Sequence, residues 1–288
     1  MRRLIQNTRV TLEMIKWEHS IFALPFALTG AVLAAGGWPR LSTLALIVLC
    51  MVSARTAAMA FNRLVDAELD AANPRTKMRA LPANLLQRGF VAGFVLVSVA
   101  VFVAGSAMLN RFCLVLSPFT LLVLLGYSFA KRFTRWSHLI LGLALGIAPS
   151  AAWIAVRGSL DPRILMLTLA VLLWVSGFDV LYAYQDYHHD SAVGLYSVPA
   201  AFGIRTSFWI ARGLHGLMLI TLVLVVFLFG LGPIAMAGIV VTAALLLYEH
   251  MIVSPSDLRR MNAAFFTLNG VISVLFFAFV AADVLHRR

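Results

Sequence analysis

The stretch ILMLTLAVLLWVSGFDVLYAYQ, residues 164–185, is an almost unbroken apolar run. It is long enough to cross a bilayer as a helix, which takes about 20 apolar residues. Acidic residues mark its end: Asp179 lies inside the run, and Asp186 and Asp190 follow it. Because a carboxylate beside hydrocarbon is costly, acids in such a place indicate a functional site.

Eight further apolar runs of similar length accompany this one. With 61% hydrophobic residues, 12% charged residues and a mean hydropathy of +0.92, the chain is unlike soluble domains, which carry about 25% charged residues. We therefore predict an all-α membrane protein, a bundle of nine transmembrane helices in one polytopic domain over residues 1–288. The eight runs cover residues 20–37, 42–61, 90–109, 112–130, 138–156, 208–229, 233–252 and 264–284.

The net charge of +11 is distributed unevenly between the two ends of these runs. If the N-terminus is cytoplasmic, the cytoplasmic side holds 16 of the 23 Lys and Arg, counting Arg212 near the start of the run 208–229. The opposite side holds six, and Arg55 lies inside a run. This bias follows the positive-inside rule and predicts a multi-pass protein of the inner (cell) membrane with a cytoplasmic N-terminus. It accounts for the charge without a nucleic-acid partner, and we expect none.

The first acidic cluster, NRLVDAELD at residues 62–70, follows the second apolar run. On a continuous helix Asn62, Asp66 and Asp70 share one face, and Arg55 lies on that face too. Asp66 and Asp70 repel each other as bare neighbours. A bound Mg²⁺ removes that repulsion, since it is held by one or two carboxylates together with substrate phosphates. The alternative is a solvated helix end without a metal.

Two basic residues, Lys77 and Arg79, follow this cluster in a loop. An arginine fork or a lysine ammonium binds phosphate oxygens. Ordinary positive-inside charge explains these two residues equally well.

The second acidic cluster contains Asp179, Tyr182, Asp186 and Asp190. Their offsets of 0, 3, 7 and 11 residues trace one face of a helix over three turns. Tyr182 lies between the acids, where its hydroxyl could donate to phosphate. Two such clusters facing each other would hold divalent cations, which in turn hold a phosphate group, and we predict both clusters at the cytoplasmic side.

These residues resemble the two motifs of the UbiA family of membrane prenyltransferases. Asn62-x-x-x-Asp66-x-x-x-Asp70 matches the first motif, and Asp179-x-x-Tyr182-x-x-x-Asp186-x-x-x-Asp190 matches the second. Pro82-Ala83-Asn84 departs from the family pattern, because a glycine is common there. Further matches are Leu24-Pro25, Thr76-x-x-Arg79-x-Leu81-Pro82, Tyr127-x-x-x-Lys131-Arg132-Phe133-Thr134 and Gly194-x-x-Ser197.

The resemblance implies nine helices around a central cavity and an Mg²⁺-dependent enzyme. The expected reaction moves a polyprenyl group from polyprenyl diphosphate onto an aromatic acid of the 4-hydroxybenzoate type, in ubiquinone or menaquinone biosynthesis. A dihydroxynaphthoate acceptor is the alternative within the family. The implied metal ligands are Asn62, Asp66, Asp70, Asp179, Asp186 and Asp190, with Asp66, Asp70, Asp179, Asp186 and Tyr182 as catalytic residues.

The remaining site residues are expected to bind the two substrates. Lys77, Arg79 and Lys131 would donate to the diphosphate. Arg55 would pair with the carboxylate of the acceptor, or else form an ion pair between helices. The aromatic ring of Tyr127 or Tyr182 would stabilise an allylic cation. The polyprenyl tail would lie in an apolar groove facing the lipid bilayer.

Two other classes of membrane protein also use aspartates. Phosphatidyl-transferases carry D-x-x-D-G, whereas Asp66 and Asp70 have three residues between them and no following glycine. A non-enzymatic ion-coupled transporter places its acids near the middle of the bilayer on broken helices. The acids of this chain lie at the cytoplasmic ends of apolar runs, which favours the prenyltransferase.

Overall fold

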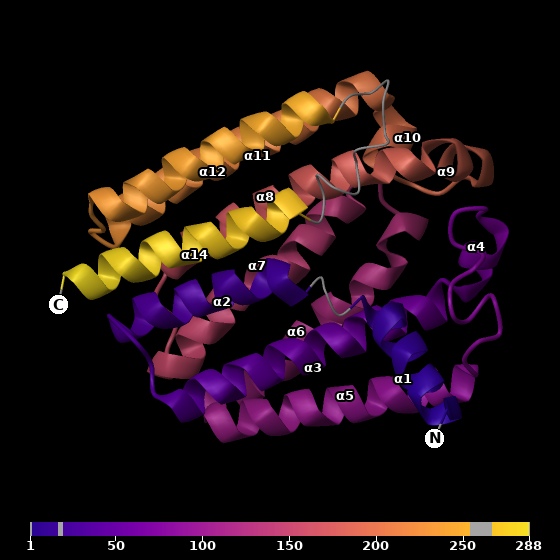
Figure 1. Ribbon diagram of the computed structural model, residues 1–288, viewed down its shortest axis with the longest axis horizontal. Coiled ribbons are helices and arrows are strands. Elements are labelled where there is room, and N and C mark those ends of the chain that lie inside the picture. Colours follow the sequence, from indigo (N-terminus) through magenta and orange to yellow (C-terminus); the bar gives the residue numbers. More distant parts are fainter. Residues whose placement is uncertain (1, 17–19, 254–266, 288) are drawn as a thin grey trace.

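The computed structural model describes residues 2–16, 20–253 and 267–287, and this part of the chain is helical without any strand. Figure 1 shows the long helices lying side by side. Eight helical segments are long and apolar enough to span a membrane. They are α3 (Leu41–Val65), α5 (Arg88–Leu109), α6 (Arg111–Gly126) continued by η2 (Tyr127–Arg132), α7 (Ser137–Arg157), α8 (Ile164–Tyr182) continued by η3 (Ala183–Asp186) and α9 (Tyr187–Val193), α11 (Ile204–Leu228), α12 (Pro233–Ile252) and α14 (Asn269–His286).

The predicted apolar runs all correspond to helices. The run 20–37 corresponds to α2 (Ser20–Ala35), an apolar helix of only 16 residues that packs against α7 and α14. The predicted break near residues 230–232 is confirmed, because α11 ends at Leu228 and α12 begins at Pro233. The run 264–284 begins outside the described residues and continues as α14. The all-α membrane fold is thus confirmed, while nine as the exact number of spans stays a prediction.

Helix α8 lies at the centre of the core, between α7 and α11. Its Trp174 is fully buried and packs on Phe26 of α2 with ring centroids 5.0 Å apart. Two glycines of α7, Gly142 and Gly146, bring that helix close to α8. A Cβ on Gly142 would lie 2.4 Å from the carbonyl oxygen of Leu172. Small residues at such spacing allow close packing of helices in membranes.

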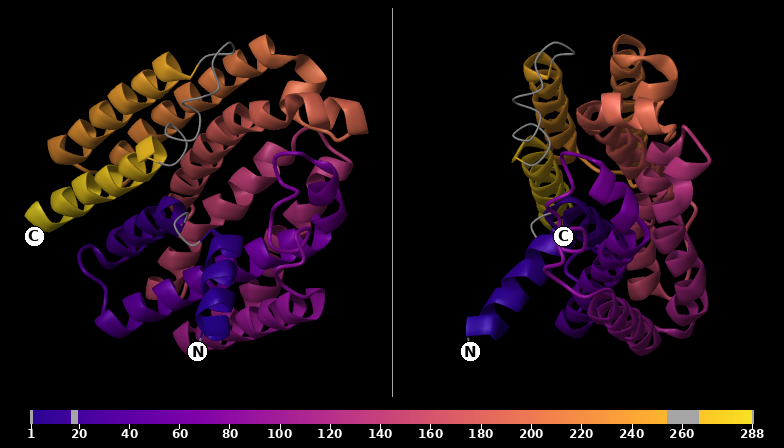
Figure 2. Two further views of the ribbon diagram at one scale, coloured as in Figure 1. Left: turned by 45° about the vertical axis from the view of Figure 1, so that its right-hand side comes forward. Right: turned by 90° about the vertical axis from the view of Figure 1, so that its right-hand side faces the viewer.

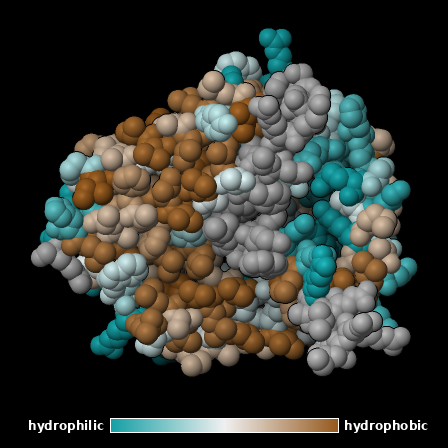
Figure 3. Space-filling view, viewed as in Figure 1, coloured by the Kyte–Doolittle hydropathy of each residue, from teal (hydrophilic) through white to brown (hydrophobic). Residues whose placement is uncertain are grey.

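The short helices gather at one end of the bundle. Figures 1 and 2 show α4 (Ala67–Ala72), α9 and α10 (Val198–Phe202) at this end, and α14 running to the opposite end. The amphipathic α1 (Arg2–Ile15) lies across α3, where the Nε of Arg63 donates to the carbonyl of Met14 at 3.4 Å. Figure 3 shows an apolar surface over the long helices and a hydrophilic surface at the end with the short ones. Both acidic clusters lie at this hydrophilic end.

Candidate active site

The two acidic clusters line the same cavity, which has a volume of about 650 Å³. Lys77 is exposed and is not among the lining residues, so its position does not support the predicted role in binding diphosphate. The predicted site residues that do line the cavity are Arg55, Asn62, Asp66, Asp70, Arg79, Tyr127, Lys131, Asp179, Tyr182, Asp186 and Asp190.

The first cluster lies on a helix that is almost continuous. Helix α3 ends at Val65, and α4 begins after Asp66, whose φ and ψ are −93° and 4°. The hydrogen bonds of the α-helix nevertheless continue, because Asp66 N donates to Asn62 O and Asp70 N donates to Asp66 O. Asn62, Asp66 and Asp70 therefore lie on one side of the chain, toward the cavity.

The second cluster changes its helical geometry along its length. Helix α8 gives way to the 3₁₀ segment η3 at residues 183–186, and α9 follows. A 3₁₀ helix has three residues per turn, so it rotates the later residues relative to a continuous α-helix. Asp179, Tyr182, Asp186 and Asp190 all still reach the cavity.

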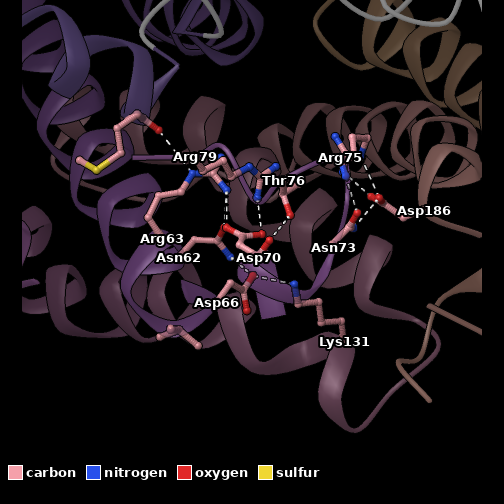
Figure 4. Close-up of polar contacts among 12 residues, drawn as sticks. Asn62, Arg63, Asp66, Asp70, Asn73, Arg75, Thr76, Arg79, Lys131 and Asp186 are labelled. Carbon is pink, nitrogen blue, oxygen red and sulfur yellow. Dashed lines mark hydrogen bonds and ion pairs between the residues drawn. The ribbon is translucent and has the colours of Figure 1, made fainter. Parts of the chain in front are cut away.

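Asp66 is buried and contacts two basic residues of η2. The Nζ of Lys131 lies 2.7 Å from its Oδ2, and an Arg132 nitrogen lies 3.3 Å from its Oδ1. Asn62 also donates to Oδ2 through its side-chain nitrogen at 3.1 Å. Figure 4 shows Lys131 approaching Asp66 from this separate element.

Asp70 is buried beside two arginines, as Figure 4 shows. Arg79 donates to its Oδ1 at 2.7 Å, while a nitrogen of Arg63 lies 3.9 Å from its Oδ2. Oδ2 is buried and has no hydrogen-bond partner within the described part of the chain. A buried acceptor without a partner costs free energy, so this oxygen is available to a ligand.

Asp186 joins the second cluster to the loop that follows the first. Asn73 donates to its Oδ1 at 2.9 Å, and Arg75 forms a two-pronged hydrogen-bonded ion pair with its carboxylate. Burial alone would lower the pKa of Arg75, but the hydrogen bonds and charge of Asp186 outweigh burial and raise that pKa. The Oδ1 of Asn73 also accepts from Arg75 N, which fixes the turn that directs Arg75 toward Asp186.

Asp179 is paired with a histidine. The Nδ1 of His138, in the first turn of α7, lies 2.6 Å from the Oδ2 of Asp179. On the other side of the ring, Val198 N donates to Nε2 at 3.3 Å. The imidazole thus connects the C-terminal part of α8 to the start of α10.

Below the acids, the cavity is lined by apolar side chains and Arg55. The Nε of Arg55 is buried, and none of the described residues hydrogen-bonds it. The apolar lining includes Phe119 of α6, which is 63% exposed, so the cavity wall is open at this residue. The other apolar residues of this region include Leu116, Val123, Leu124, Ile147 and Leu165.

Several residues that contact the aspartates were not predicted from the sequence. Arg132 was visible only as part of the match around Tyr127, and Asn73 only as a residue that ends a helix. Arg75 and His138 carried no signal of their own, because each contacts an acid far away in the sequence. Arg63 could have been suspected from its place between Asn62 and Asp66, but its direction depends on the fold.

Similarity to known proteins identifies the family of this chain. A sequence model of the UbiA prenyltransferase family matches residues 23–279. The chain belongs to this family. The 4-hydroxybenzoate octaprenyltransferase of Vibrio cholerae is 32% identical to this chain over 256 residues. The matched region covers 88% of this chain and 88% of that protein.

Solved UbiA structures have the same fold. A UbiA homologue from Aeropyrum pernix K1, solved without ligands, is 31% identical, covers 92% of this chain and 98% of its own, and superposes with a TM-score of 0.84. A UbiA homologue from Archaeoglobus fulgidus bound to DMAPP and Mg²⁺ covers 96% and 99% with a TM-score of 0.73. At 20% identity, the second likeness supports the fold alone.

The residues of this UbiA chain fit a divalent cation that is completed by phosphate. In the part of the chain that the structure describes, no three His, Cys, Asp or Glu residues are grouped closely enough to hold an ion by themselves. Mg²⁺ does not require such a group, because it binds one or two carboxylates together with water and substrate phosphates. The unpartnered Oδ2 of Asp70 and the other carboxylates of the cavity offer the oxygen ligands it prefers.

Proposed function

We propose that this protein transfers a polyprenyl group from polyprenyl diphosphate to an aromatic acid of the 4-hydroxybenzoate type, with Mg²⁺ as cofactor. The observation that carries the proposal is that both acidic clusters line one cavity, which continues along apolar side chains. The relative from Vibrio cholerae, named as a 4-hydroxybenzoate octaprenyltransferase, supports the choice of acceptor.

Asp66, Asp70, Asp179 and Asp186 would hold the cation, with Asn62 and Asp190 as further oxygen ligands. Bound Mg²⁺ would neutralise the negative charge that develops on the departing diphosphate. Lys131 and Arg79 already lie within 2.7 Å of Asp66 and Asp70. They would donate to the diphosphate oxygens from the same positions.

As the bond from the allylic carbon to the diphosphate oxygen breaks, that carbon would form a bond with an electron-rich ring carbon of the acceptor, which would then lose its proton and regain aromaticity. Tyr127 and Tyr182 line the cavity, and their ring faces would stabilise the allylic cation by about 0.5–2 kcal/mol. The buried Nε of Arg55 lacks a partner among the described residues and would receive the carboxylate of the aromatic acid. An arginine fork and a carboxylate match in geometry as well as in charge.

Two alternatives remain from the sequence: a dihydroxynaphthoate acceptor and an ion-coupled transporter. A dihydroxynaphthoate also carries a carboxylate and an electron-rich ring, so Arg55 would serve it equally well. An ion-coupled transporter would need acids near the middle of the membrane. The aspartates of the two clusters lie instead where long helices end, at the hydrophilic end of the bundle.

We further propose that the hydrophilic end with the active site faces the cytoplasm across the inner (cell) membrane. The excess of Lys and Arg in the segments at this end supports this orientation. The acceptor would then arrive from the cytoplasm, and the polyprenyl diphosphate from the bilayer.

The test is a transfer assay with membranes that contain the protein. Radiolabelled polyprenyl diphosphate is supplied with Mg²⁺, and 4-hydroxybenzoate and dihydroxynaphthoate are offered side by side. We expect a prenylated 4-hydroxybenzoate in the mass spectrum, loss of product with excess EDTA, and recovery when Mg²⁺ is restored. If prenylated naphthoate is the sole product, dihydroxynaphthoate replaces 4-hydroxybenzoate as the proposed acceptor. Folded protein that forms neither product would reject the proposed function.

A further inference from the structure

The aspartates of the cavity differ in what neutralises them. Asp66, Asp70 and Asp186 each form an ion pair with a lysine or an arginine. Among the residues that the structure describes, Asp179 has no such partner and instead contacts the imidazole of His138. Asp179, like Asp190, is therefore a cavity carboxylate without a lysine or arginine ion pair among the described residues, and its hydrogen bond to His138 decides how it is held.

The hydrogen bonds around His138 identify the ring nitrogen that carries hydrogen. Because Val198 N–H donates to Nε2, that nitrogen must act as an acceptor. The ring hydrogen then lies on Nδ1 and is donated to the Oδ2 of Asp179 at 2.6 Å. His138 is 4% exposed, so water does not compete strongly for these bonds.

The position of His138 is itself held by the fold. The Oγ of Ser176 on α8 shares its hydrogen between the carbonyl oxygens of Leu172 at 2.7 Å and His138 at 3.1 Å, which links the first turn of α7 to α8. Val198 lies at the start of α10 and fixes the far side of the ring. The imidazole therefore cannot turn without breaking contacts to two other elements.

We propose that His138 is a positioning residue for Asp179: it holds Oδ2 by a hydrogen bond and so presents Oδ1 to the divalent cation of the diphosphate site. This inference rests on the proposed function. Oδ1 is the oxygen that the described contacts leave for a ligand, and Asp179 lines the cavity. Groups that orient a metal ligand from outside typically account for about 10–100-fold in metal affinity or activity.

The experiment measures cation binding separately from turnover. Purified protein in detergent is titrated with Mn²⁺ in the presence of geranyl S-thiolodiphosphate, an unreactive donor analogue, and the free Mn²⁺ is followed by electron paramagnetic resonance. His138→Leu removes the donor. His138→Asn restores it, because the amide nitrogen takes about the place of Nδ1. Ser176→Ala is the matched control, since it removes a hydrogen bond from the same turn of α7 without touching Asp179.

We expect His138→Leu to weaken Mn²⁺ binding by about 10–100-fold, and His138→Asn and Ser176→Ala to stay within about threefold of the wild type. In an Asp179→Asn background, His138→Leu should have little further effect. In the transfer assay, the Mg²⁺ concentration for half-maximal rate should rise while the rate at saturating Mg²⁺ is largely recovered.

Unchanged Mn²⁺ binding in His138→Leu would overturn the inference. An equal loss in Ser176→Ala, or an undiminished effect in the Asp179→Asn background, would do so too, because each would point to general damage to the fold. If the leucine variant is not recovered folded, His138→Met takes its place with the same expected loss. Because Mn²⁺ binding is measured without turnover, a wild-type protein that binds Mn²⁺ but prenylates neither acceptor would reject only the proposed function.

Discussion

At the scale of single residues, the active site combines acids and bases that are already paired before a substrate arrives. Lys131 and Arg79 neutralise Asp66 and Asp70, which keeps these buried carboxylates from repelling each other. Removing one partner of a buried ion pair leaves an uncompensated charge, whose cost is of order 3–5 kcal/mol when burial is complete. In the proposed function the same lysine and arginine would also bind the diphosphate.

The aspartates should be essential for turnover. Asp66→Ala and Asp186→Ala are each expected to lower the transfer rate by about 10²-fold or more, because the charge of the leaving diphosphate loses its stabilisation. Glu68→Ala is the matched control, since the Glu68 side chain is 89% exposed and lies outside the cavity lining. Rates are compared for preparations with equal amounts of monodisperse protein. Near wild-type rates in both aspartate variants would contradict the assignment of the cluster.

Asn84 lies in the loop that departs from the family pattern. Its φ is +54°, a left-handed conformation that glycine adopts freely and asparagine tolerates better than other residues. The loop therefore contains a left-handed residue although none of residues 82–84 is a glycine.

Because Asn84 is exposed, substitutions there test the backbone alone. We expect Asn84→Gly to change the free energy of unfolding in detergent by no more than about 0.5 kcal/mol. Asn84→Val is expected to lower it by about 1–2 kcal/mol, as measured by thermal unfolding. A valine variant as stable as the wild type would show that the turn is not left-handed.

At the scale of helices, the approach of α7 to α8 places His138 next to Asp179. Gly142 lies one turn after His138, and a side chain there would meet the Oγ of Ser176 at 2.3 Å. The close contact of these helices and the hydrogen bond of Ser176 to His138 therefore depend on the same turn.

A large side chain at this contact should separate the two helices. Gly142→Leu is expected to lower stability by about 1–3 kcal/mol or more, because the core at the contact is overpacked. Gly216→Leu on α11 makes the same chemical change where nothing lies within 4 Å, and it should be tolerated. Thermal unfolding followed by size-exclusion chromatography in detergent compares them, and equal stability would contradict the close contact.

The sequence predicted the helices well, because apolar runs in a membrane chain leave few alternatives to a helix. It also identified the aspartates of the cavity from two patterns of spacing. It could not predict contacts such as that of Arg75 with Asp186, which lie 111 residues apart. Nor could it separate Arg79, which enters the cavity, from the exposed Lys77, because the turn that begins at Asn73 decides which basic residues face inward.

At the scale of the whole molecule, the charges predict how the bundle sits in the membrane. The loop that contains Met78 lies at the end with the acidic clusters, and Ser159 lies at the far end between α7 and α8. The positive-inside rule places the first in the cytoplasm and the second on the opposite side.

Labelling of introduced cysteines can test this orientation. In a background with Cys50 and Cys113 replaced by serine, Met78→Cys and Ser159→Cys are treated with a membrane-impermeant maleimide on intact cells. We expect Ser159→Cys to react at once and Met78→Cys to react only after permeabilisation, because both side chains are exposed and only the membrane separates them from the reagent. The reverse pattern would show that the active site faces outward.

The apolar wall of the cavity, which is open at Phe119, has a consequence for how the enzyme is saturated. A donor that enters sideways is supplied in two dimensions, so its effective concentration is its mole fraction in the lipid and not its amount per litre. Adding inert phospholipid at constant total donor should therefore slow the reaction, while diluting the whole membrane suspension with acceptor-containing buffer should leave the rate per enzyme unchanged.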